Sequence, residues 1–503
     1  MRLIDYLDRG ASIASASTCL VDGDRTFSYS AVVATSHLIA NGLRQRGIGP
    51  GRRVAVLSPN SAAAFLAVLG VLRSGATWIP ANARATADEL TEQLRMADAA
   101  ALFYDPALEA TAKHLACQVP TLQWTISLDD APSSDSALFP DAPEDNTREA
   151  ILGFTGGTTG RPKAVVASAR NVEAMTTALL AHVDIGDPAI YLAAAPLTHA
   201  AGILSFPVLA TGGTIVILRG VDITEILDTI EQQRITFLFL PPTVIYMMLA
   251  HPGVRDTDFS SLRAFVYAAA PMAPEKLRQS LDVFGPRMVQ LYGQSEAAMI
   301  CTVLTAKDHL DALKHAPHRL ESCGRPSVVA RIGVMNDEGG LVPAGAVGEI
   351  VVRSSLVMEG YLGDPDPSVR AHGWHHTGDV GRIDADGFVY LLDRKKDMIV
   401  TGGFNVFSAE VETAVLTHPD VVQCAVVGTP DPHWGEAVTA VVETAPGSDV
   451  SPADVIAHCR ALLSGVKCPK RVEIWAQLPR NAAGKILKRE VRDTFWQSRS
   501  RRI

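Results

Sequence analysis

Residues 154–165, with the sequence FTGGTTGRPKAV, are the stretch around which the rest of the chain is interpreted. They follow the apolar residues 150–152, which predict a buried strand. Glycine lets successive backbone N–H groups turn toward one anion, and hydroxyls and a lysine can complete such a cradle. The stretch is not a Walker A loop, because Pro162 precedes Lys163 and Ala164 follows it. The alternative to a phosphate loop is a flexible surface turn. The residues predicted to hold phosphate are Thr155, Gly156, Gly157, Thr158, Thr159, Gly160 and Lys163.

The composition is that of a globular protein with more than one domain. At 503 residues, 47% of them hydrophobic, the chain exceeds what one ordinary core organises. A net charge of -9 argues against a nucleic-acid partner and against a basic membrane-binding patch. The seven cysteines form no C-x-x-C pair, which is typical of reduced thiols and excludes a recognisable zinc site.

Neither a signal peptide nor a membrane span is expected. Asp5, Asp8 and Arg9 interrupt any apolar stretch at the start of the chain, and the longest apolar run, 62–72, is too short to cross a bilayer. We therefore expect a soluble, cytoplasmic protein. A homodimer is left open.

Helical and strand patterns alternate along most of the chain. Helices are expected at 31–46, 62–72 and 86–97, the last opened by Thr86 and Glu89 at the spacing of a capping box. Strands are expected at 53–57, 76–79, 100–104, 190–194, 215–218, 237–240 and 264–268. This rhythm predicts an α/β fold with doubly wound, mostly parallel sheets.

The last third of the chain has a different pattern. Short strands and glycine-rich turns over 324–353 predict a small β-subdomain. Strands at 421–427 and 437–443, with a helix at 453–463, predict a small α+β unit at the C-terminus. Residues 130–145, rich in Ser, Pro and Asp, are expected to form a surface connection.

The segment 290–299, QLYGQSEAAM, predicts a nucleotide contact. A strand ending at Tyr292 would present an aromatic face on which a planar base can stack. Glu296 would then supply a carboxylate suited to Mg²⁺, which takes oxygen ligands beside phosphates. The alternative is a solvated glutamate.

Three further segments carry polar residues of interest. Asp379, in the sequence HTGD, is expected at a strand-to-turn corner, where it would accept hydrogen bonds from a ribose diol, and Arg394 is expected to meet the same ribose. The charged run 393–397 is interpreted as a linker or hinge, and Lys485, in NAAGK, could reach into a cleft between domains. Each has an ordinary alternative: a turn aspartate, a solvated surface turn and a surface lysine.

Taken together and in this order, these motifs closely resemble those of the adenylate-forming enzymes, which include acyl-CoA synthetases, peptide-synthetase adenylation domains and firefly luciferase. The resemblance covers most of the chain. It implies a large N-terminal domain, 1–394, that binds ATP and the acid, and a mobile C-terminal cap, 395–503, that rotates about Lys396 and carries Lys485. The cofactors implied are ATP, Mg²⁺ and CoA.

The resemblance also implies a role for each matching residue. The 154–165 loop would hold the pyrophosphate of ATP, Glu296 and Thr155 would bind Mg²⁺, and Lys485 would join the carboxylate to the α-phosphate. Rotation would then bring Gly402 and Gly403 toward the thiol, with Trp434 either flanking its tunnel or serving as a structural residue. The other residues expected at the nucleotide or at CoA are Ala268, Ala269, Ala270, Pro271, Leu291, Tyr292, Gly293, Gln294, Ser295, Asp379, Arg394 and Lys396.

Three positions depart from the family pattern. Gly156 stands where the family usually has Ser, which removes a hydroxyl donor to phosphate, and Ala164 stands where it usually has Gly. Ser408 stands where it commonly has Pro. In addition, residues 466–470 offer only two lysines to the nucleotide end of CoA. The acceptor is therefore left open between CoA and the phosphopantetheine of an acyl carrier protein.

The segment 196–202, PLTHAAG, matches the part of the family that lines the acyl pocket. It has no acidic residue for a substrate ammonium, and a buried ammonium or second carboxylate without a partner costs several kcal/mol, on the order of 2–7 for uncompensated polar groups. A hydrophobic aliphatic, alicyclic or aryl acid is expected. His199 is either a catalytic gate to the thiol tunnel or a core histidine. The expected lining is His199, Ala200, Ala201, Ala268, Gly293, Ala298 and Met299.

The sequence thus predicts an AMP-forming acyl-CoA ligase, an acid–thiol ligase, with fatty acid metabolism as its expected setting. The nearest alternative is a free-standing adenylating enzyme that loads a carrier protein. A more distant one is a nucleotide-binding module without catalysis.

Overall fold

The computed structural model describes residues 1–130, 145–156, 162–198, 200–363, 367–445, 447–480 and 486–496. Most of the predicted surface connection at 130–145 therefore lies outside the described residues. The chain forms two compact units: Met1–Ile332 with Val352–His375 and Gly387–Val389, and Gly333–Val351 with His376–Asp386 and Tyr390–Ile503. The predicted domain boundary between 394 and 395 marks where the C-terminal cap would rotate. The division into compact units reflects packing and does not test a rotation, so this boundary stays a prediction.

The first sheet of the first unit is mostly parallel. It runs, in spatial order, β15 (Arg325–Pro326), β14 (Thr302–Leu304), β13 (Met288–Tyr292), β12 (Ala264–Tyr267), β11 (Phe237–Leu240), β9 (Ile190–Ala193), β10 (Thr214–Ile217), β1 (Thr18–Asp22) and β2 (Arg25–Ser28). Neighbours from β13 to β1 pair in parallel, and the strands beyond them pair antiparallel.

The second sheet contains the predicted phosphate loop. It runs β18 (Gly360–Tyr361), β8 (Pro162–Ser168), β7 (Glu149–Gly156), β4 (Thr77–Ala81), β3 (Arg53–Leu57), β5 (Ala101–Tyr104) and β6 (Trp124–Ser127). The strands from β7 to β6 pair in parallel, whereas β8 pairs antiparallel with both β7 and β18.

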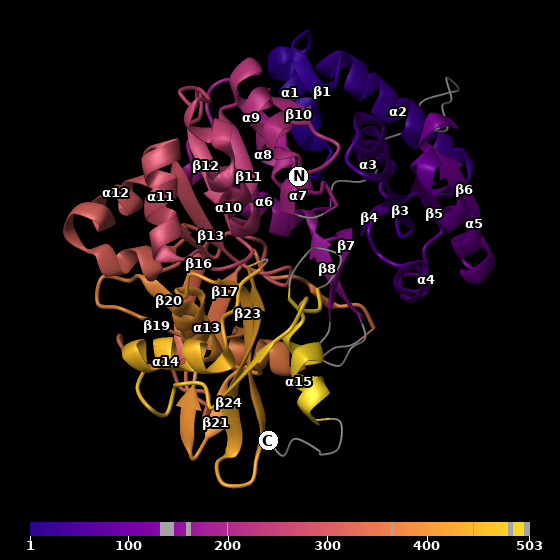
Figure 1. The fold of residues 1–503 in the computed structure, drawn as a ribbon. Helices are drawn as coiled ribbons and strands as arrows, with labels where there is room; N and C mark the ends of the chain where they lie inside the picture. The colour runs from indigo at the N-terminus through magenta and orange to yellow at the C-terminus, as the bar shows by residue number, and fades with distance from the viewer. Residues whose placement is uncertain are drawn as a thin grey trace. The chain divides into compact units, whose positions relative to one another are not determined.

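Helices of the first unit connect these strands (Figure 1). They are α1 (Asp5–Ala14), α2 (Tyr29–Gln45), α3 (Ala62–Ser74), α4 (Ala87–Met96), α5 (Glu109–Gln118), α6 (Ala169–His182), α7 (Ala200–Ile203), α8 (Ser205–Ala210), α9 (Ile223–Gln232), α10 (Pro242–Ala250), α11 (Pro274–Phe284) and α12 (Ala306–His315). The capping box predicted for Thr86 and Glu89 is present at the start of α4. The predicted doubly wound α/β architecture is confirmed.

The apolar run 62–72 forms a core helix because both sheets cover it. Helix α3 packs on β3 and β4 of the second sheet and on β1 of the first. All of its residues except Ala63 are buried, so an apolar surface on every side is stable there. Gly75 ends the helix in the left-handed conformation at φ +81°. Among the residues that the structure describes, no helix combines the length and the apolar character needed to cross a bilayer.

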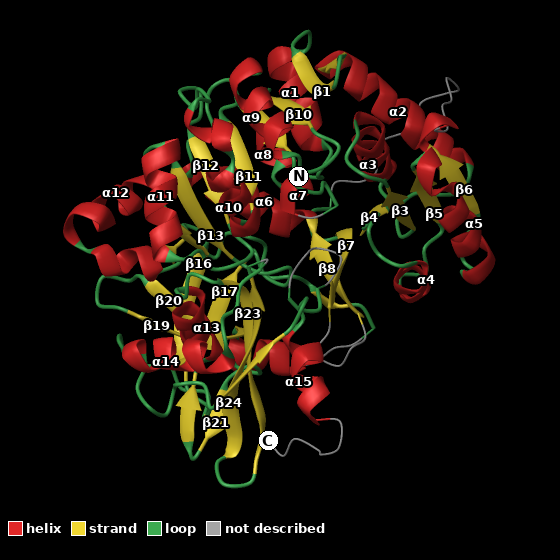
Figure 2. Ribbon diagram, in the orientation of Figure 1, coloured by secondary structure: helices red, strands yellow, loops and turns green. Residues whose placement is uncertain are grey.

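The remaining strands form two sheets. One runs β16 (Ala330–Met335), β17 (Gly348–Ser354), β19 (His375–Ile383) and β20 (Val389–Arg394). The other runs β22 (Phe404–Val406), β21 (Ile399–Thr401), β24 (Gly435–Thr444) and β23 (Val421–Asp431), with β25 (Arg471–Ile474) paired to β24. Helices α13 (Ser408–Leu416), α14 (Pro452–Leu462) and α15 (Lys488–Trp496) complete the C-terminal α+β unit (Figure 2).

Candidate active site

The predicted phosphate loop joins two antiparallel strands. In the β7–β8 hairpin, Thr155 lies opposite Lys163 and Gly156 lies opposite Pro162. A Walker A loop instead leads from a strand into a helix, so the hairpin agrees with the exclusion of that motif. The structure thus places the hydroxyl-bearing Thr155 and the cationic Lys163 side by side at the base of the loop. The residues Gly157, Thr158, Thr159 and Gly160 lie outside the described part.

Ala164 faces the core. Its side chain is buried in a cluster that includes Leu152 of β7 and Leu90 of α4. A methyl group at this position therefore packs inward rather than toward the loop. This packing explains why alanine is accommodated at position 164, where the family usually has glycine.

The loop lysine and the predicted metal ligand are linked through a residue that sequence analysis missed. The ammonium of Lys163 lies 4.6 Å from the centroid of the Tyr361 ring, and the hydroxyl of Tyr361 donates a hydrogen bond to Oε1 of Glu296 at 2.9 Å. The ring face is attractive to a cation, and a hydrogen bond to a carboxylate is of the stronger kind. Tyr361 thus contacts both charged groups.

The segment that carries Tyr361 is held along its length. Residues 355–358 bond to the Glu296 segment: the N–H of Met358 donates to the carbonyl of Glu296 at 2.9 Å, and that of Ala298 donates to the carbonyl of Leu356 at 3.0 Å. On the other side, Gly360 and Tyr361 pair with Val166 and Val165 of β8. The segment therefore ties Glu296 to the phosphate-loop hairpin.

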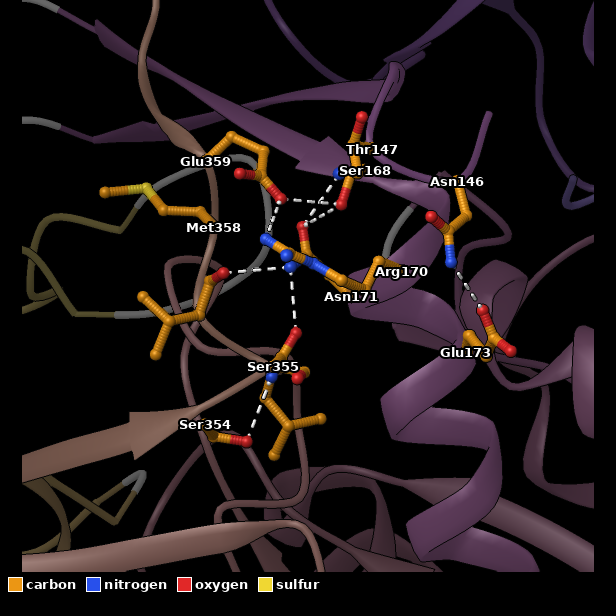
Figure 3. Close-up of polar contacts among 12 residues, drawn as sticks. Asn146, Thr147, Ser168, Arg170, Asn171, Glu173, Ser354, Ser355, Met358 and Glu359 are labelled. Carbon is orange, nitrogen blue, oxygen red and sulfur yellow. Dashed lines mark hydrogen bonds and ion pairs between the residues drawn. The ribbon is translucent and has the colours of Figure 1, made fainter. Parts of the chain in front are cut away.

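Side chains at the start of α6 anchor this segment (Figure 3). The amide of Asn171 donates to the carbonyls of Ser355 at 2.9 Å and Val357 at 2.8 Å. The carboxylate of Glu359 accepts from the Ser168 hydroxyl at 2.8 Å and from the Arg170 guanidinium at 2.9 Å. Because Ser168 and Asn171 are buried, their bonds are partly shielded from water and fix the backbone that leads to Tyr361, whereas the Arg170 contact is exposed.

The predicted adenine contacts lie at one edge of the first sheet. Strands β12 and β13 pair in parallel, so the residues after them, 268–271 and 293–295, leave the sheet at the same edge, where α/β sheets bind ligands. Tyr292 and Leu291 are buried at the end of β13, whereas Ala269, Ala270 and Pro271 are exposed. Ala269 has a left-handed φ of +73°.

Gly293 is required by the fold of the next turn. A Cβ on it would lie 2.5 Å from the carbonyl carbon of Met299. This close approach lets residues 293–299 fold back, with reciprocal hydrogen bonds between Gln294 and Ala297. The turn carries the exposed Ser295 and the half-buried Glu296.

The two predicted ribose contacts lie against each other. Nε of Arg394, at the end of β20, lies 2.6 Å from Oδ1 of Asp379, and Asp379 is 7% exposed whereas Arg394 is 44% exposed. The prediction of a strand-to-turn corner for Asp379 is wrong, because this residue lies within β19. Gly378 has a left-handed φ of +67° inside this strand, an angle that is more usual in turns.

Glu349 on β17 supports this pair and was also missed by sequence analysis. It accepts from the N–H of Gly378 at 3.0 Å, and its other oxygen lies 3.1 Å from Nδ1 of His376 and 3.4 Å from Nζ of Lys395. Its partners are 27 to 46 residues away in sequence, so no local pattern reveals it.

The second unit contains the residue predicted as the hinge, Lys396, and those predicted to lie near the thiol, Gly402, Gly403 and Trp434. Burial lowers the pKa of Lys396, and the nearby Arg394 and Arg492 add to that effect, while Asp397 opposes it. Trp434 packs on Gly402, because a Cβ on Gly402 would lie 2.5 Å from Cε3 of the indole. Trp434 is still 47% exposed, so both of its predicted roles stay open.

Most residues of the predicted acyl lining are small, and two of the described ones are buried. The carbonyl of Ala201 accepts from the hydroxyls of Tyr191 and Ser205, both at 3.2 Å, and both Ala201 and Ala268 are buried. Ala200, Ala298 and Met299 are partly exposed. His199 and Lys485 lie outside the described residues, and within the part that is described, no group of His, Cys, Asp and Glu is arranged to hold a metal by itself.

Two family models match the chain. The model of AMP-binding enzymes matches residues 7–362, and the model of their C-terminal domain matches residues 410–485. The chain belongs to the AMP-binding enzymes. The predicted membership of the adenylate-forming superfamily, and with it the prediction of an enzyme of the ligase class, is confirmed.

Individual relatives agree over nearly the whole chain. A feruloyl-CoA synthase of Amycolatopsis sp is 36% identical over 495 residues, which cover 97% of this chain and 98% of the relative. The fatty acid–[acyl-carrier-protein] ligase ScoC of Streptomyces coeruleorubidus is 34% identical over 95% of this chain and 93% of the relative. The structure of the amide bond synthetase McbA from Marinactinospora thermotolerans, at 34% identity, superposes with a TM-score of 0.88 over 98% of this chain and 100% of McbA.

Proposed function

We propose that this chain is an AMP-forming acyl-CoA ligase that activates a hydrophobic carboxylic acid with ATP and transfers the acyl group to CoA. The arrangement of Lys163, Tyr361 and Glu296 carries the proposal. The cation proposed to bind phosphate and the carboxylate proposed to bind the metal both contact one tyrosine, in a member of the AMP-binding enzymes. Attack of a carboxylate on the α-phosphorus of ATP needs such groups, because two anions must approach each other.

Each described residue has a defined task in this scheme. Lys163 and the hydroxyl of Thr155 bind phosphate oxygens, and Asp379 accepts hydrogen bonds from the ribose hydroxyls while Arg394 holds its carboxylate in place. Glu296 and Thr155 supply oxygen donors, which is the donor type that fits Mg²⁺. When bound, Mg²⁺ would neutralise charge on the phosphates. Lys485 is proposed to bring the acid to the α-phosphate.

The first half-reaction forms a bond between a carboxylate oxygen and the α-phosphorus and releases pyrophosphate. In the second, the thiol attacks the carbonyl carbon of the acyl-adenylate, loses its proton and expels AMP. Because AMP is a good leaving group, a strong general base is not required. We assign no base among the described residues.

A hydrophobic acid is proposed because the predicted lining offers small apolar side chains. Ala200, Ala201, Ala268 and Ala298 carry no charge to pair with an ammonium or a second carboxylate. Burying either group without a partner costs several kcal/mol, on the order of 2–7. Amino acids and dicarboxylates should therefore be poor substrates, and fatty or aryl acids should be favoured.

A carrier protein is the second candidate acceptor, and one observation favours it. The two lysines of 466–470 are engaged within the C-terminal unit: Nζ of Lys467 lies 2.6 Å from the Glu410 carboxylate, and Nζ of Lys470 donates to the carbonyl of Gly465 at 2.6 Å. They are thus less available to the phosphates of CoA. The ScoC relative, by its name, acts on a carrier protein.

A cytoplasmic location is part of the proposal. All seven cysteines, each within the described residues, are free thiols, and all but Cys117 are buried. Free thiols are typical of a reducing compartment.

The proposal is tested by measuring pyrophosphate release over a panel of fatty, aryl, amino and dicarboxylic acids, with CoA, a phosphopantetheinyl carrier protein or a simple amine as acceptor. We expect release with hydrophobic monocarboxylates and thioester formation with CoA. Thioester only on the carrier protein would favour the second candidate, and an amide product would favour the chemistry for which McbA is named. If none of the acids in the panel caused pyrophosphate release, both candidate functions would be contradicted.

A further inference from the structure

Tyr361 contacts two charged residues of the candidate site, and the scheme above assigns it no task. It is half-buried, and its hydroxyl and its ring face each meet a different charged residue: Glu296 at 2.9 Å and Lys163 at 4.6 Å. Those two residues come from separate elements, a turn after β13 and the β7–β8 hairpin.

We infer that Tyr361 is a positioning residue, which orients the Glu296 carboxylate for a divalent cation and holds the Lys163 ammonium in place for a phosphate. The inference rests on the proposed function, because it concerns the same nucleotide site.

The backbone fixes where the hydroxyl points. Gly360 and Tyr361 pair with β8, and the N–H groups of Glu359 and Leu362 donate to the carbonyls of Val166 and Ala164, both at 2.9 Å. The anchors shown in Figure 3 hold the preceding residues to α6. A tyrosine on such a rigid segment loses little further freedom when it binds a carboxylate, so its hydrogen bond is preorganised.

The hydroxyl occupies one oxygen of Glu296 and leaves acceptor sites on the carboxylate open. An ionised carboxylate offers about four lone-pair sites. With Oε1 held by Tyr361 and the backbone carbonyl held by Met358, the carboxylate has a defined orientation before any cation arrives. Ligand carboxylates are commonly oriented in this way by hydrogen-bond donors outside the metal's own ligand set.

The ring has a separate effect. Its face contacts the Lys163 ammonium while the hydroxyl contacts Glu296, whose charge is opposite to that of Lys163 and would attract the ammonium directly. By giving the ammonium an aromatic face, Tyr361 offers Lys163 a partner other than the Glu296 carboxylate, so that each charge can meet its own ligand: phosphate for Lys163 and the cation for Glu296.

The two effects are separated by two substitutions. Tyr361→Phe removes the hydroxyl and keeps the ring, whereas Tyr361→Leu removes both. Tyr390→Phe is the matched control, because the Tyr390 hydroxyl also donates to a carboxylate, that of Asp384 at 3.2 Å, and neither residue is among those predicted to bind the nucleotide or Mg²⁺. Thermal unfolding of each variant confirms that it folds.

Equilibrium binding of ATP is measured calorimetrically, without acid, over a range of Mg²⁺ concentrations. For Tyr361→Phe we expect the Mg²⁺ concentration at half-maximal ATP binding to rise about tenfold, the loss expected for one hydrogen bond to a charged group. ATP binding without Mg²⁺ should be unchanged in this variant. It should weaken in Tyr361→Leu, where Lys163 is released.

An unchanged Mg²⁺ dependence in Tyr361→Phe, or an equal shift in Tyr390→Phe, would overturn the positioning role. If the unsubstituted protein binds ATP with the expected Mg²⁺ dependence but activates no acid, the proposed function fails while the role of Tyr361 stands. If the unsubstituted protein binds no ATP, both are overturned.

Discussion

Arg394 and Asp379, which are 15 positions apart in the sequence, form an ion pair with 2.6 Å between Nε and Oδ1. The Asp379 carboxylate is almost fully buried and the Arg394 guanidinium is partly exposed. The guanidinium therefore offsets the buried negative charge and is the part of the pair that solvent reaches. A buried carboxylate that loses its partner is costly, because its charge is then uncompensated.

Arg394→Ala should therefore weaken both nucleotide binding and the fold. We expect ATP affinity to fall about tenfold or more, the loss for one charge-assisted hydrogen bond, with a lower unfolding temperature. Calorimetric binding and thermal unfolding measure the two effects. Arg325→Ala is the control, because Arg325 also pairs with a largely buried carboxylate, that of Asp308 at 2.8 Å, and neither residue is a predicted nucleotide contact. Equal losses in both variants would contradict a specific role for Arg394.

Ser408 explains one departure from the family pattern. Its N–H and hydroxyl both donate to the Asp393 carboxylate, and its hydroxyl oxygen accepts from Nζ of Lys488 at 2.8 Å. Burial raises the pKa of Asp393, against the lowering effect of Lys488. A proline has no N–H and could not make the first bond.

Ser408→Pro should thus destabilise the C-terminal unit more than Ser408→Ala, which keeps the N–H. We expect a difference of about 1–3 kcal/mol in the free energy of unfolding, the cost of leaving a buried acceptor without a donor. Urea unfolding of the two variants measures it. Equal stabilities would show that the N–H of Ser408 contributes nothing to the fold.

His309 should make stability depend on pH. Its Nδ1 donates to the Thr305 carbonyl at 2.8 Å, so Nε2 accepts from the Tyr267 hydroxyl at 2.9 Å. Burial lowers the pKa of His309 from 6.5 to about 4, although Thr305 and Asp308 oppose the shift. The unfolded chain therefore binds the proton first as the pH falls, and stability is lost from about pH 6.5 to about pH 4.

The measurement is the free energy of unfolding in urea across this pH range. We expect His309 to account for a loss of about 3 kcal/mol, and His309→Gln to flatten that part of the profile. His315→Gln, at the exposed end of the same helix, is the control. A profile in His309→Gln as steep as that of the unsubstituted protein would exclude His309 as its source.

Local patterns predicted the elements well, because their signals lie within a few residues. Strands 53–57 and 237–240 were predicted with the observed bounds, and so was the capping box of α4. The site was predicted only in part. Tyr361 meets Glu296 across 65 residues, and Glu349 meets Gly378 across 29 residues, and these pairings arise from the packing of distant segments rather than from a local motif. Asp379 was placed at a corner because glycine-aspartate is common in turns, whereas strand pairing kept it inside β19.

Gly403→Leu should block thioester formation and spare adenylation. Gly403 has φ +81°, and a Cβ there would meet no described atom within 4 Å, so the substitution strains the backbone without a clash in this structure. The proposed arrival of the thiol beside this turn adds a second obstacle. Single-turnover assays of the two half-reactions measure the effect.

Two further variants make this test specific. Gly447→Leu, at φ +79° and equally open among the described residues, introduces the same kind of strain away from the proposed thiol path. Lys485→Ala should show the opposite split, losing adenylation and retaining thioester formation from supplied acyl-adenylate. If Gly403→Leu lost adenylation and kept thioester formation, its assignment to the second half-reaction would be wrong.

The formation of an acyl-adenylate is the central claim, and isotope transfer tests it most directly. The enzyme is supplied with ATP, Mg²⁺, CoA and a hydrophobic acid whose carboxylate carries heavy oxygen, and the products are analysed by mass spectrometry. Because one carboxylate oxygen bonds to the α-phosphorus and leaves with it, the account predicts AMP that carries one heavy oxygen atom, in amounts equal to acyl-CoA. Unlabelled AMP, or ADP with labelled phosphate, would contradict it.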